Sequence, residues 1–199
     1  MSGNRLQKLI LVDPNGALCV AWREAFAAWA EVEVVSGYFE HLEAYDCLVS
    51  AANSFGLMDG GVDLAIKRYF GAELEVRVQT YILEHYLGEQ PVGTSFIIGT
   101  GHERYPFVAH TPTMRVPMTI GRTDYVYVAM WAMLLAVRQH NLGGGRPIEV
   151  VACPGLGTAT GGMEVTEAAR QMSLAYGHFR RPPTYIDWRY ADRRQGVVG

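Results

Sequence analysis

Short apolar runs alternate with longer amphipathic stretches along most of the chain. The runs predict strands at residues 8–13, 32–35, 46–51, 95–99, 106–112 and 148–152. Apolar residues recur at helical spacing across 17–29, 60–70, 72–87, 124–140 and 164–178, and residues 38–45 form a short connection with one helical turn. Because strands alternate with helices throughout, we predict a three-layer α/β/α domain.

The same pattern gives a simple domain count. No linker, repeat or low-complexity segment interrupts residues 1–178, so we predict a single domain there. Arg180-Arg181-Pro182-Pro183 breaks the last amphipathic helix. The remaining tail, residues 179–199, is polar, aromatic and rich in Arg, and we expect it to be an edge strand at 185–188 or partly disordered.

Composition narrows the class of protein. The chain has 199 residues, a net charge of −3 and three cysteines, Cys19, Cys47 and Cys153, in apolar surroundings. These features favour an intracellular, cytoplasmic protein with reduced thiols and without a nucleic-acid partner. We expect no membrane segment, because no apolar run reaches about 18 residues, and no signal peptide, because Met1–Arg5 does not lead into an apolar core. The oligomeric state does not follow from these data.

Two glycine-rich stretches stand out as candidate binding loops. Residues 51–63 follow one apolar strand and residues 154–163 follow another, and each leads into a helix. The carboxyl edge of an open α/β sheet is where ligands bind, and glycines let backbone N–H groups approach an anion near a helix N-terminus. We therefore predict that the two loops grip one phosphorylated small molecule. Asp59 is expected to cap the helix at 60–70, and Gly71 to end it.

These residues resemble the macrodomain family, the ADP-ribose-binding or Appr-1″-p processing-like fold. The family pattern V-x-x-G-D-I, then D-A-I-V-N-A-A-N, then G-G-G-V-D-x-A-I is matched at Val34–Phe39, Asp46–Asn53 and Gly60–Ile66. The family's second phosphate loop, P-G-L-G-T-G-T-G-G, is similar to Pro154–Gly162. The resemblance covers roughly residues 7–178 and implies a mixed sheet between helices, with a cleft for ADP-ribose or an ADP-ribosylated protein.

The resemblance also implies roles for individual residues. Asn53 contacts the distal ribose, and Asp63 positions or activates water for attack at the anomeric carbon, which makes these two the catalytic candidates. The implied ligand-binding residues are Tyr38, Phe39, Ala52, Asn53, Gly60, Gly61, Val62, Gly155, Leu156, Gly157, Thr158, Ala159, Thr160, Gly161 and Gly162. No cofactor is implied.

Three positions depart from the family pattern. Tyr38 stands where the family has its adenine-reading Asp, Ser50 replaces the first Asn of N-A-A-N, and Lys67 replaces a His of several hydrolytic members. Two alternatives therefore stay open: a non-catalytic ADP-ribose reader or assembly protein that kept the fold, and a dinucleotide-binding oxidoreductase.

The remaining chemistry-bearing residues give weaker signals. The six histidines lack metal-ligand spacing, so we predict no metal site. No Gly-x-Ser-x-Gly elbow supports serine hydrolase chemistry, and no Lys-Ser or Lys-Thr follows either loop as in a Walker-type site. Cys153 could line the cleft but is more simply a buried hydrophobe. Arg115 is a candidate phosphate partner or a solvent-facing residue.

Overall fold

The computed structural model describes residues 6–198. Residues 1–5, on which the expectation of no signal peptide depends, and residue 199 lie outside the described part. The strands are β1 (Lys8–Asp13), β2 (Val32–Ser36), β3 (Cys47–Asn53), β4 (Phe96–Gly99), β5 (Phe107–Met114) and β6 (Val150–Cys153). The helices are α1 (Gly16–Ala25), α2 (Gly61–Phe70), α3 (Glu73–Tyr86), α4 (Tyr125–Leu142), α5 (Val165–Arg180) and α6 (Trp188–Val198), with a 3-10 turn, η1 (Phe39–His41).

The strands form one six-stranded sheet in the order β2-β1-β6-β3-β5-β4. All neighbouring pairs are parallel except β4 and β5, which are antiparallel, so the expected mixed sheet is confirmed. Parallel strands that are covered on both faces read as nearly continuous apolar runs. The strand β1 has this character, because its four central residues are all buried.

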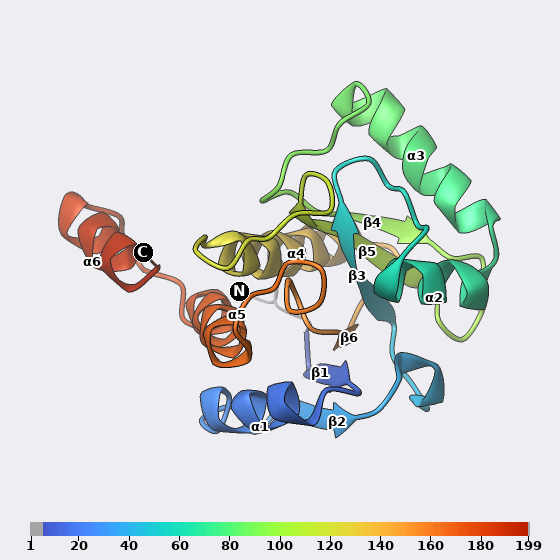
Figure 1. Ribbon diagram of the computed structural model, residues 1–199. Coiled ribbons are helices and arrows are strands. Elements are labelled where there is room, and N and C mark those ends of the chain that lie inside the picture. Colours follow the sequence, from blue (N-terminus) through green and yellow to red (C-terminus); the bar gives the residue numbers. More distant parts are fainter. Residues whose placement is uncertain (1–5, 199) are drawn as a thin grey trace.

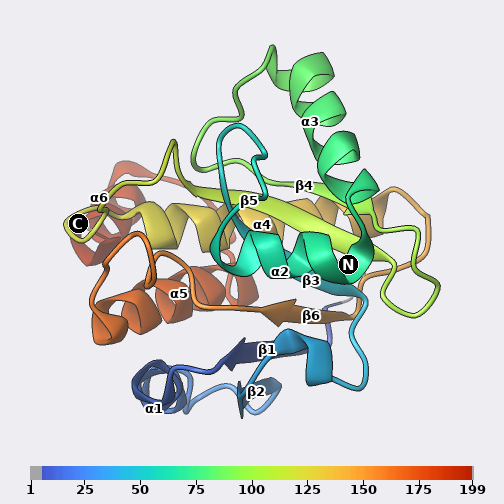
Figure 2. The same ribbon diagram turned by 45° about the vertical axis from the view of Figure 1, so that its right-hand side comes forward.

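Helices cover both faces of the sheet, as Figures 1 and 2 show. One face packs against α1, α4 and α5 through a core that includes Trp22, Met130 and Met172. The other face packs against α2 and α3 through a core that includes Ile66 and Val78. The predicted three-layer α/β/α arrangement is therefore confirmed.

The C-terminal segment differs from its prediction. Residues 185–187 pair with no strand, and the segment from Trp188 onward is the helix α6. Asp187 favours this helix, since its carboxylate accepts the backbone N–H of Tyr190 at 2.7 Å. Arg194 fastens α6 to the body by donating to the Tyr127 hydroxyl and stacking on the Trp131 ring, with 4.4 Å from its guanidinium carbon to the ring centroid. The predicted edge strand at 185–188 was therefore wrong. Trp188 begins a helix, and the contacts that hold this segment to the body come from Arg194 of that helix.

The topology places the carboxyl ends of five strands at one edge of the sheet. Five of the six strands run in the same direction, so the segments that follow β1, β2, β3, β5 and β6 all leave the sheet at its carboxyl edge. Both glycine-rich stretches belong to this set.

Within residues 6–198, no helix combines the length and the apolar character needed to cross a membrane. The three cysteines are free and buried.

Candidate functional site

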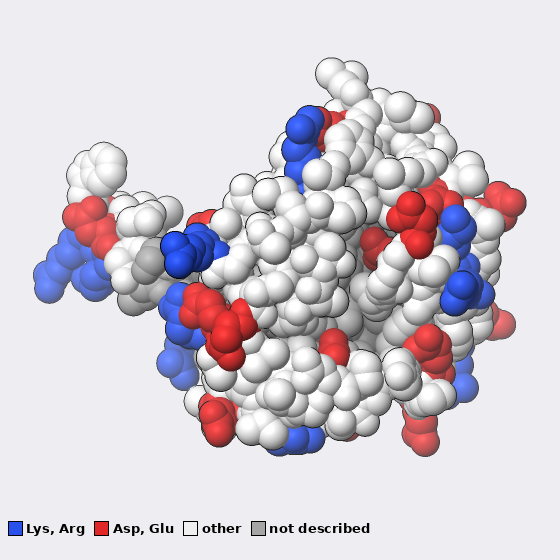
Figure 3. Space-filling model, in the orientation of Figure 1, with Lys and Arg blue, Asp and Glu red and all other residues white. Residues whose placement is uncertain are grey.

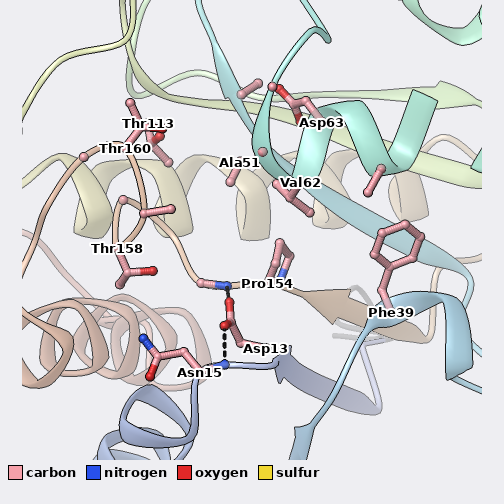
Figure 4. A pocket seen from close by; sticks show the side chains of 18 of the residues that line it. Asp13, Asn15, Phe39, Ala51, Val62, Asp63, Thr113, Pro154, Thr158 and Thr160 are labelled. Carbon is pink, nitrogen blue, oxygen red and sulfur yellow. Dashed lines mark hydrogen bonds between the residues drawn. The ribbon is translucent and has the colours of Figure 1, made fainter. Parts of the chain in front are cut away.

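A cleft of about 490 Å³ lies along the carboxyl edge of the sheet. Its lining comes from the ends of five strands: residues 13–15 after β1, 37–40 after β2, 51–63 after β3, 113–117 after β5 and 154–161 after β6. Figure 4 shows these segments converging on one hollow. A volume of this size suits a small-molecule ligand. The two glycine-rich loops thus face the same cavity, as the sequence predicts.

The loop after β6 carries a run of free hydrogen-bond donors. Among residues 6–198, no acceptor pairs with the backbone N–H groups of residues 157–161. The loop is nevertheless held in shape by its own carbonyls, because Gly157 accepts from Met163 N at 3.0 Å and Gly161 accepts from Ile120 N at 2.8 Å. Successive free N–H groups in a fixed concave loop form an anion-binding arrangement.

Close packing beneath the loop after β6 explains why glycine is needed at two of its positions. Gly157 has φ +69°, and a Cβ there would lie 2.7 Å from Ile120 Cδ1. A Cβ on Gly161 would lie 2.9 Å from Ile120 Cγ1. Two residues predicted to touch a ligand do not line the cleft: Leu156 is fully buried in the core, and Gly162 is exposed outside the lining. Leu156 therefore anchors the loop from below.

The loop after β3 ends in an open helix N-terminus. Gly60 is the N-cap of α2, and no side chain accepts the first N–H groups of this helix. The expectation that Asp59 caps α2 was wrong, because the cap falls one residue later and leaves the Asp59 carboxylate on the cleft wall. Gly71 does end the helix, with φ +94°. Uncapped N–H groups and the helix dipole favour an anion beside Gly60, Gly61 and Val62.

Asn53 lines the cleft, but its amide is used within its own loop. The side-chain oxygen accepts the N–H groups of Phe55 at 3.0 Å and Leu57 at 3.3 Å. The side-chain nitrogen donates to the Leu57 carbonyl at 2.8 Å. This geometry makes Asn53 a brace for the loop after β3, in addition to being part of the wall.

Asp63 is a buried carboxylate at the cleft. It lies in the first turn of α2 with 5 % of its surface exposed, and Figure 4 shows it above Val62. The Ser50 hydroxyl donates to its Oδ1 at 2.6 Å. Burial raises the pKa of Asp63 to about 6, the Ser50 hydrogen bond opposes this, and the charges of Asp59 and Glu75 add to it. Near neutral pH the group can thus hold or release a proton, as a general base requires.

The segment after β1 was not found from the sequence. The Asp13 carboxylate accepts Asn15 N at 2.9 Å through Oδ1 and Gly155 N at 3.1 Å through Oδ2, the bonds drawn in Figure 4. The Asn15 side chain accepts from Ala17 and Leu18 and so caps α1. This junction ties β1 to the loop after β6. Its signal was available, because Asp13-Pro14-Asn15 directly follows a buried strand of a parallel sheet.

The segment after β2 supplies the aromatic part of the cleft. Tyr38 is 57 % exposed at the rim, whereas the Phe39 ring is buried and packs edge-on against Tyr69 at 5.6 Å between centroids. Two other candidates lie elsewhere. Cys153 is buried and does not line the cleft, and Arg115 is ion-paired with Glu89 outside the lining.

Metal chemistry finds no support in the described chain. Across residues 6–198, no three His, Cys, Asp or Glu side chains are grouped so that they could hold a metal ion.

Comparisons with known proteins agree with this architecture. The macro domain family model matches residues 49–172. An uncharacterized protein of Aquifex aeolicus (strain VF5) is 34% identical over 142 residues, which cover 71% of this chain and 78% of the relative. An uncharacterized protein of Aeropyrum pernix is 33% identical over 142 residues, 71% of this chain and 69% of the relative.

Solved structures show the same fold. The macrodomain of Mycobacterium tuberculosis DarG has a TM-score of 0.58 at 23% identity, covering 71% of this chain and 88% of that one. The Oceanobacillus iheyensis macrodomain with ADP has a TM-score of 0.57 at 21% identity, covering 78% of this chain and 84% of that one. With the family model matching more than half of its length, the chain belongs to the macro domain family, an ADP-ribose-binding family.

Proposed function

We propose that this chain binds ADP-ribose, or a closely related nucleoside diphosphate ribose, in the cleft at the carboxyl edge of its sheet. The observation that supports this most is the run of unpaired N–H groups at 157–161, which shares one cavity with the uncapped N-terminus of α2. Two neutral donor sets around one hollow suit a diphosphate. The family supplies the ligand class.

The order of the strands suggests how such a ligand would lie. The strand β6 is near the middle of the sheet, with β1 and β2 on one side and β3 and β5 on the other. In this proposal the diphosphate lies against the β6 loop. The base lies on the β1–β2 side beside Pro14 and Tyr38, and the distal ribose lies on the β3–β5 side beside Asp63 and Thr113.

The proposal includes hydrolysis of ADP-ribosyl adducts of proteins. Water attacks the anomeric carbon of the distal ribose while the bond to the acceptor breaks. Asp63 accepts one proton of that water and stabilises the oxocarbenium-like charge of the transition state, and the acceptor leaves with the bonding electron pair and takes up a proton from Asp63 or from solvent. Its raised pKa and its place on the wall of the cleft support this role.

A non-catalytic reader is the second candidate, and one observation favours it. The Asn53 amide is already bonded on both its oxygen and its nitrogen within the loop. A reader needs only the two donor sets and the apolar wall. The oxidoreductase alternative is not kept, because the sheet order β2-β1-β6-β3-β5-β4, with β4 antiparallel, is not that of the two consecutive mononucleotide-binding halves of a dinucleotide-binding sheet.

Calorimetric titration with ADP-ribose tests binding. We expect heat with the wild type, none with Thr160→Glu, and a wild-type titration with Gly145→Glu. Thr160 is an exposed member of the β6 loop, so the new carboxylate repels the diphosphate without crowding the core. Gly145 lies outside the cleft, with open space where its Cβ would be. An absence of heat with the wild type at high micromolar ligand would overturn the proposal.

Turnover separates an enzyme from a reader. Release of ADP-ribose from an ADP-ribosylated protein should fall at least about 100-fold in Asp63→Asn, while its affinity for ADP-ribose stays within about threefold. The amide can still accept the Ser50 hydroxyl, so the wall keeps its shape. Equal release by both proteins would remove Asp63 from the mechanism. Binding without release by the wild type would establish the reader.

A further inference from the structure

The cleft has an unusual charge pattern for a site that holds a diphosphate. Four carboxylates line it: Asp13, Glu40, Asp59 and Asp63. Of the residues described, 6–198, no Lys or Arg lines it. Figure 3 agrees, since acidic atoms appear in and around the hollow while basic atoms lie at its periphery. Any ligand anion is therefore held by neutral donors and by no cationic side chain of the lining.

Two basic residues near the site are already engaged by acids. Lys67, on α2, is ion-paired with Glu75 at 2.5 Å. Arg115, just beyond the end of β5, is ion-paired with Glu89 through two of its guanidinium nitrogens. Neither lines the cleft. Their charges are thus offset locally and do little to balance the carboxylates inside.

The carboxylates and the N–H groups occupy different parts of the cleft. Asp13 and Glu40 belong to the segments after β1 and β2, and Asp59 and Asp63 to the segment after β3. The free N–H run lies between them, after β6. From one end to the other, the lining reads acidic, neutral donors, acidic. Backbone N–H groups offer partial positive charge in the middle and at the N-terminus of α2, but within residues 6–198 no Lys or Arg of the lining balances the carboxylates on either side.

Asp59 is the clearest member of this pattern. Within the described chain its carboxylate makes no hydrogen bond and no ion pair, and the residue is exposed at the cleft wall. It neither caps α2 nor braces a loop, so folding does not account for it. The negative charge of Asp59 instead acts on the group that the distal end of a ligand presents. Like charges brought together in a binding site repel each other and so discriminate between ligands.

We propose that the cleft selects its ligand by charge: it takes a diphosphate whose two ends carry no further phosphate. This deepens the proposed function and rests on it. Applied to ADP-ribose, Asp59 and Asp63 disfavour a phosphate at the 1″ position, and Asp13 and Glu40 disfavour one at the 2′ position of the adenosine ribose. The substrate class is an ADP-ribosyl group on a neutral or cationic side chain, and an adduct on a phosphate group is excluded.

A paired titration tests the selection. We expect the wild type to bind ADP-ribose 1″-phosphate about tenfold or more weakly than ADP-ribose at low salt. Asp59→Asn should narrow that ratio about threefold, and raising the salt should narrow it too, because exposed charges are screened. Glu84→Gln is the matched control: this exposed acid lies on α3, outside the cleft, and its removal should leave the ratio unchanged.

The outcomes separate the two proposals. Equal affinities of the wild type for both ligands would overturn the charge selection while leaving ADP-ribose binding intact. A ratio that responds neither to Asp59→Asn nor to salt would overturn it as well, because the discrimination would then be steric. An absence of heat with both ligands would instead mean that the chain does not bind ADP-ribose, which is the failure of the proposed function.

Discussion

The two glycine-rich loops look alike in sequence but are constrained differently. In the loop after β6, a Cβ on Gly155, Gly157 or Gly161 would come within 3 Å of neighbouring atoms. In the loop after β3, a Cβ on Gly56 would also lie 2.7 Å from Val78, but at the cleft end of this loop a Cβ on Gly60 or Gly61 would meet nothing within 4 Å. The first loop is thus locked by the core beneath its cleft-facing residues, and the second is open where it meets the cleft.

The difference shows what each glycine is for. The β6 loop needs glycine in order to fold at all, because Ile120 and Leu156 fill the space below it. At Gly60, with an extended φ of −149°, the fold tolerates a side chain, and only an approaching ligand requires its absence. Glycine content alone therefore does not distinguish a structural loop from a contact surface.

The largest expected effect comes from filling the locked loop. Gly157→Val forces a β-branched side chain to a φ of +69°, against Ile120 and Val126 at 2.7 and 2.8 Å from the Cβ position. Left-handed strain and overpacking together should cost about 3 kcal/mol or more of unfolding free energy. ADP-ribose binding should be lost with it. Urea denaturation and calorimetry measure the two effects.

Gly60→Ala is the matched variant in the open loop. Its unfolding free energy should fall by only about 0.5 to 1 kcal/mol, because alanine is a poorer N-cap than glycine but meets no steric conflict. Its affinity for ADP-ribose should nevertheless fall, since the added methyl group would occupy the ligand's side of the wall. If both variants lost stability equally, the contrast between the loops would be wrong.

Asp63 gives a second contrast, visible as a function of pH. Its folded pKa of about 6 lies above the ordinary value of 3.8. Between these values the unfolded chain releases a proton that the folded chain keeps, so the wild type loses stability as pH rises from about 4 to 6 and then stays level. Asp63→Asn removes this loss. Relative to that variant, the wild type should be about 2 kcal/mol less stable at pH 7 than at pH 4.

Denaturation midpoints of both proteins at pH 4, 5, 6 and 7 check this. Glu84→Gln, an exposed acid on α3, should track the wild type across the same range. A difference between the wild type and Asp63→Asn that does not change with pH would mean that the carboxyl group is not held above its usual pKa.

Much of the fold follows from the sequence because burial leaves a clear pattern. The six strands and five of the six helices fall within a few residues of their predicted places, since parallel strands and amphipathic helices carry strong periodic signals. The tail did not follow, because α6 depends on Arg194 reaching the Tyr127 hydroxyl and the Trp131 ring. Contacts between residues so far apart leave no local pattern to read.

The site was predicted in part for the same reason. Glycine-rich loops after apolar strands are visible in the sequence, and both do line the cleft. The place of Asp13 at the cleft could be inferred from the strand that it ends, but its hydrogen bond to Gly155 could not, because the two residues are 142 positions apart. The position of Asp59 was misjudged by one helical residue, which turned a presumed cap into a free carboxylate on the cleft wall.

A smaller effect is expected at Asn53, the brace of the open loop. Asn53→Ala removes two accepted hydrogen bonds and one donated bond in an exposed to part-buried setting, and should cost about 1 to 2 kcal/mol. Asn53→Ser adds no charge, and its hydroxyl can brace a turn more weakly, so it should cost less. If Asn53 also contacts the distal ribose through its nitrogen, ADP-ribose affinity falls in both variants; if it acts only as a brace, affinity follows the stability of the loop and the Ser variant binds nearly like the wild type.

The smallest effect on stability and binding is expected at Arg115, a cation that lies near the cleft but does not line it. Its ion pair with Glu89 is exposed, so Arg115→Ala should change stability by less than about 0.5 kcal/mol. Because Arg115 does not line the cleft, ADP-ribose affinity should not change. Glu89→Gln, which frees the guanidinium, should not change it either. Weaker binding in Arg115→Ala together with tighter binding in Glu89→Gln would mean that Arg115 contacts the diphosphate. The cleft would then bind its ligand with the help of a cation, and the proposed selection by neutral donors would be wrong.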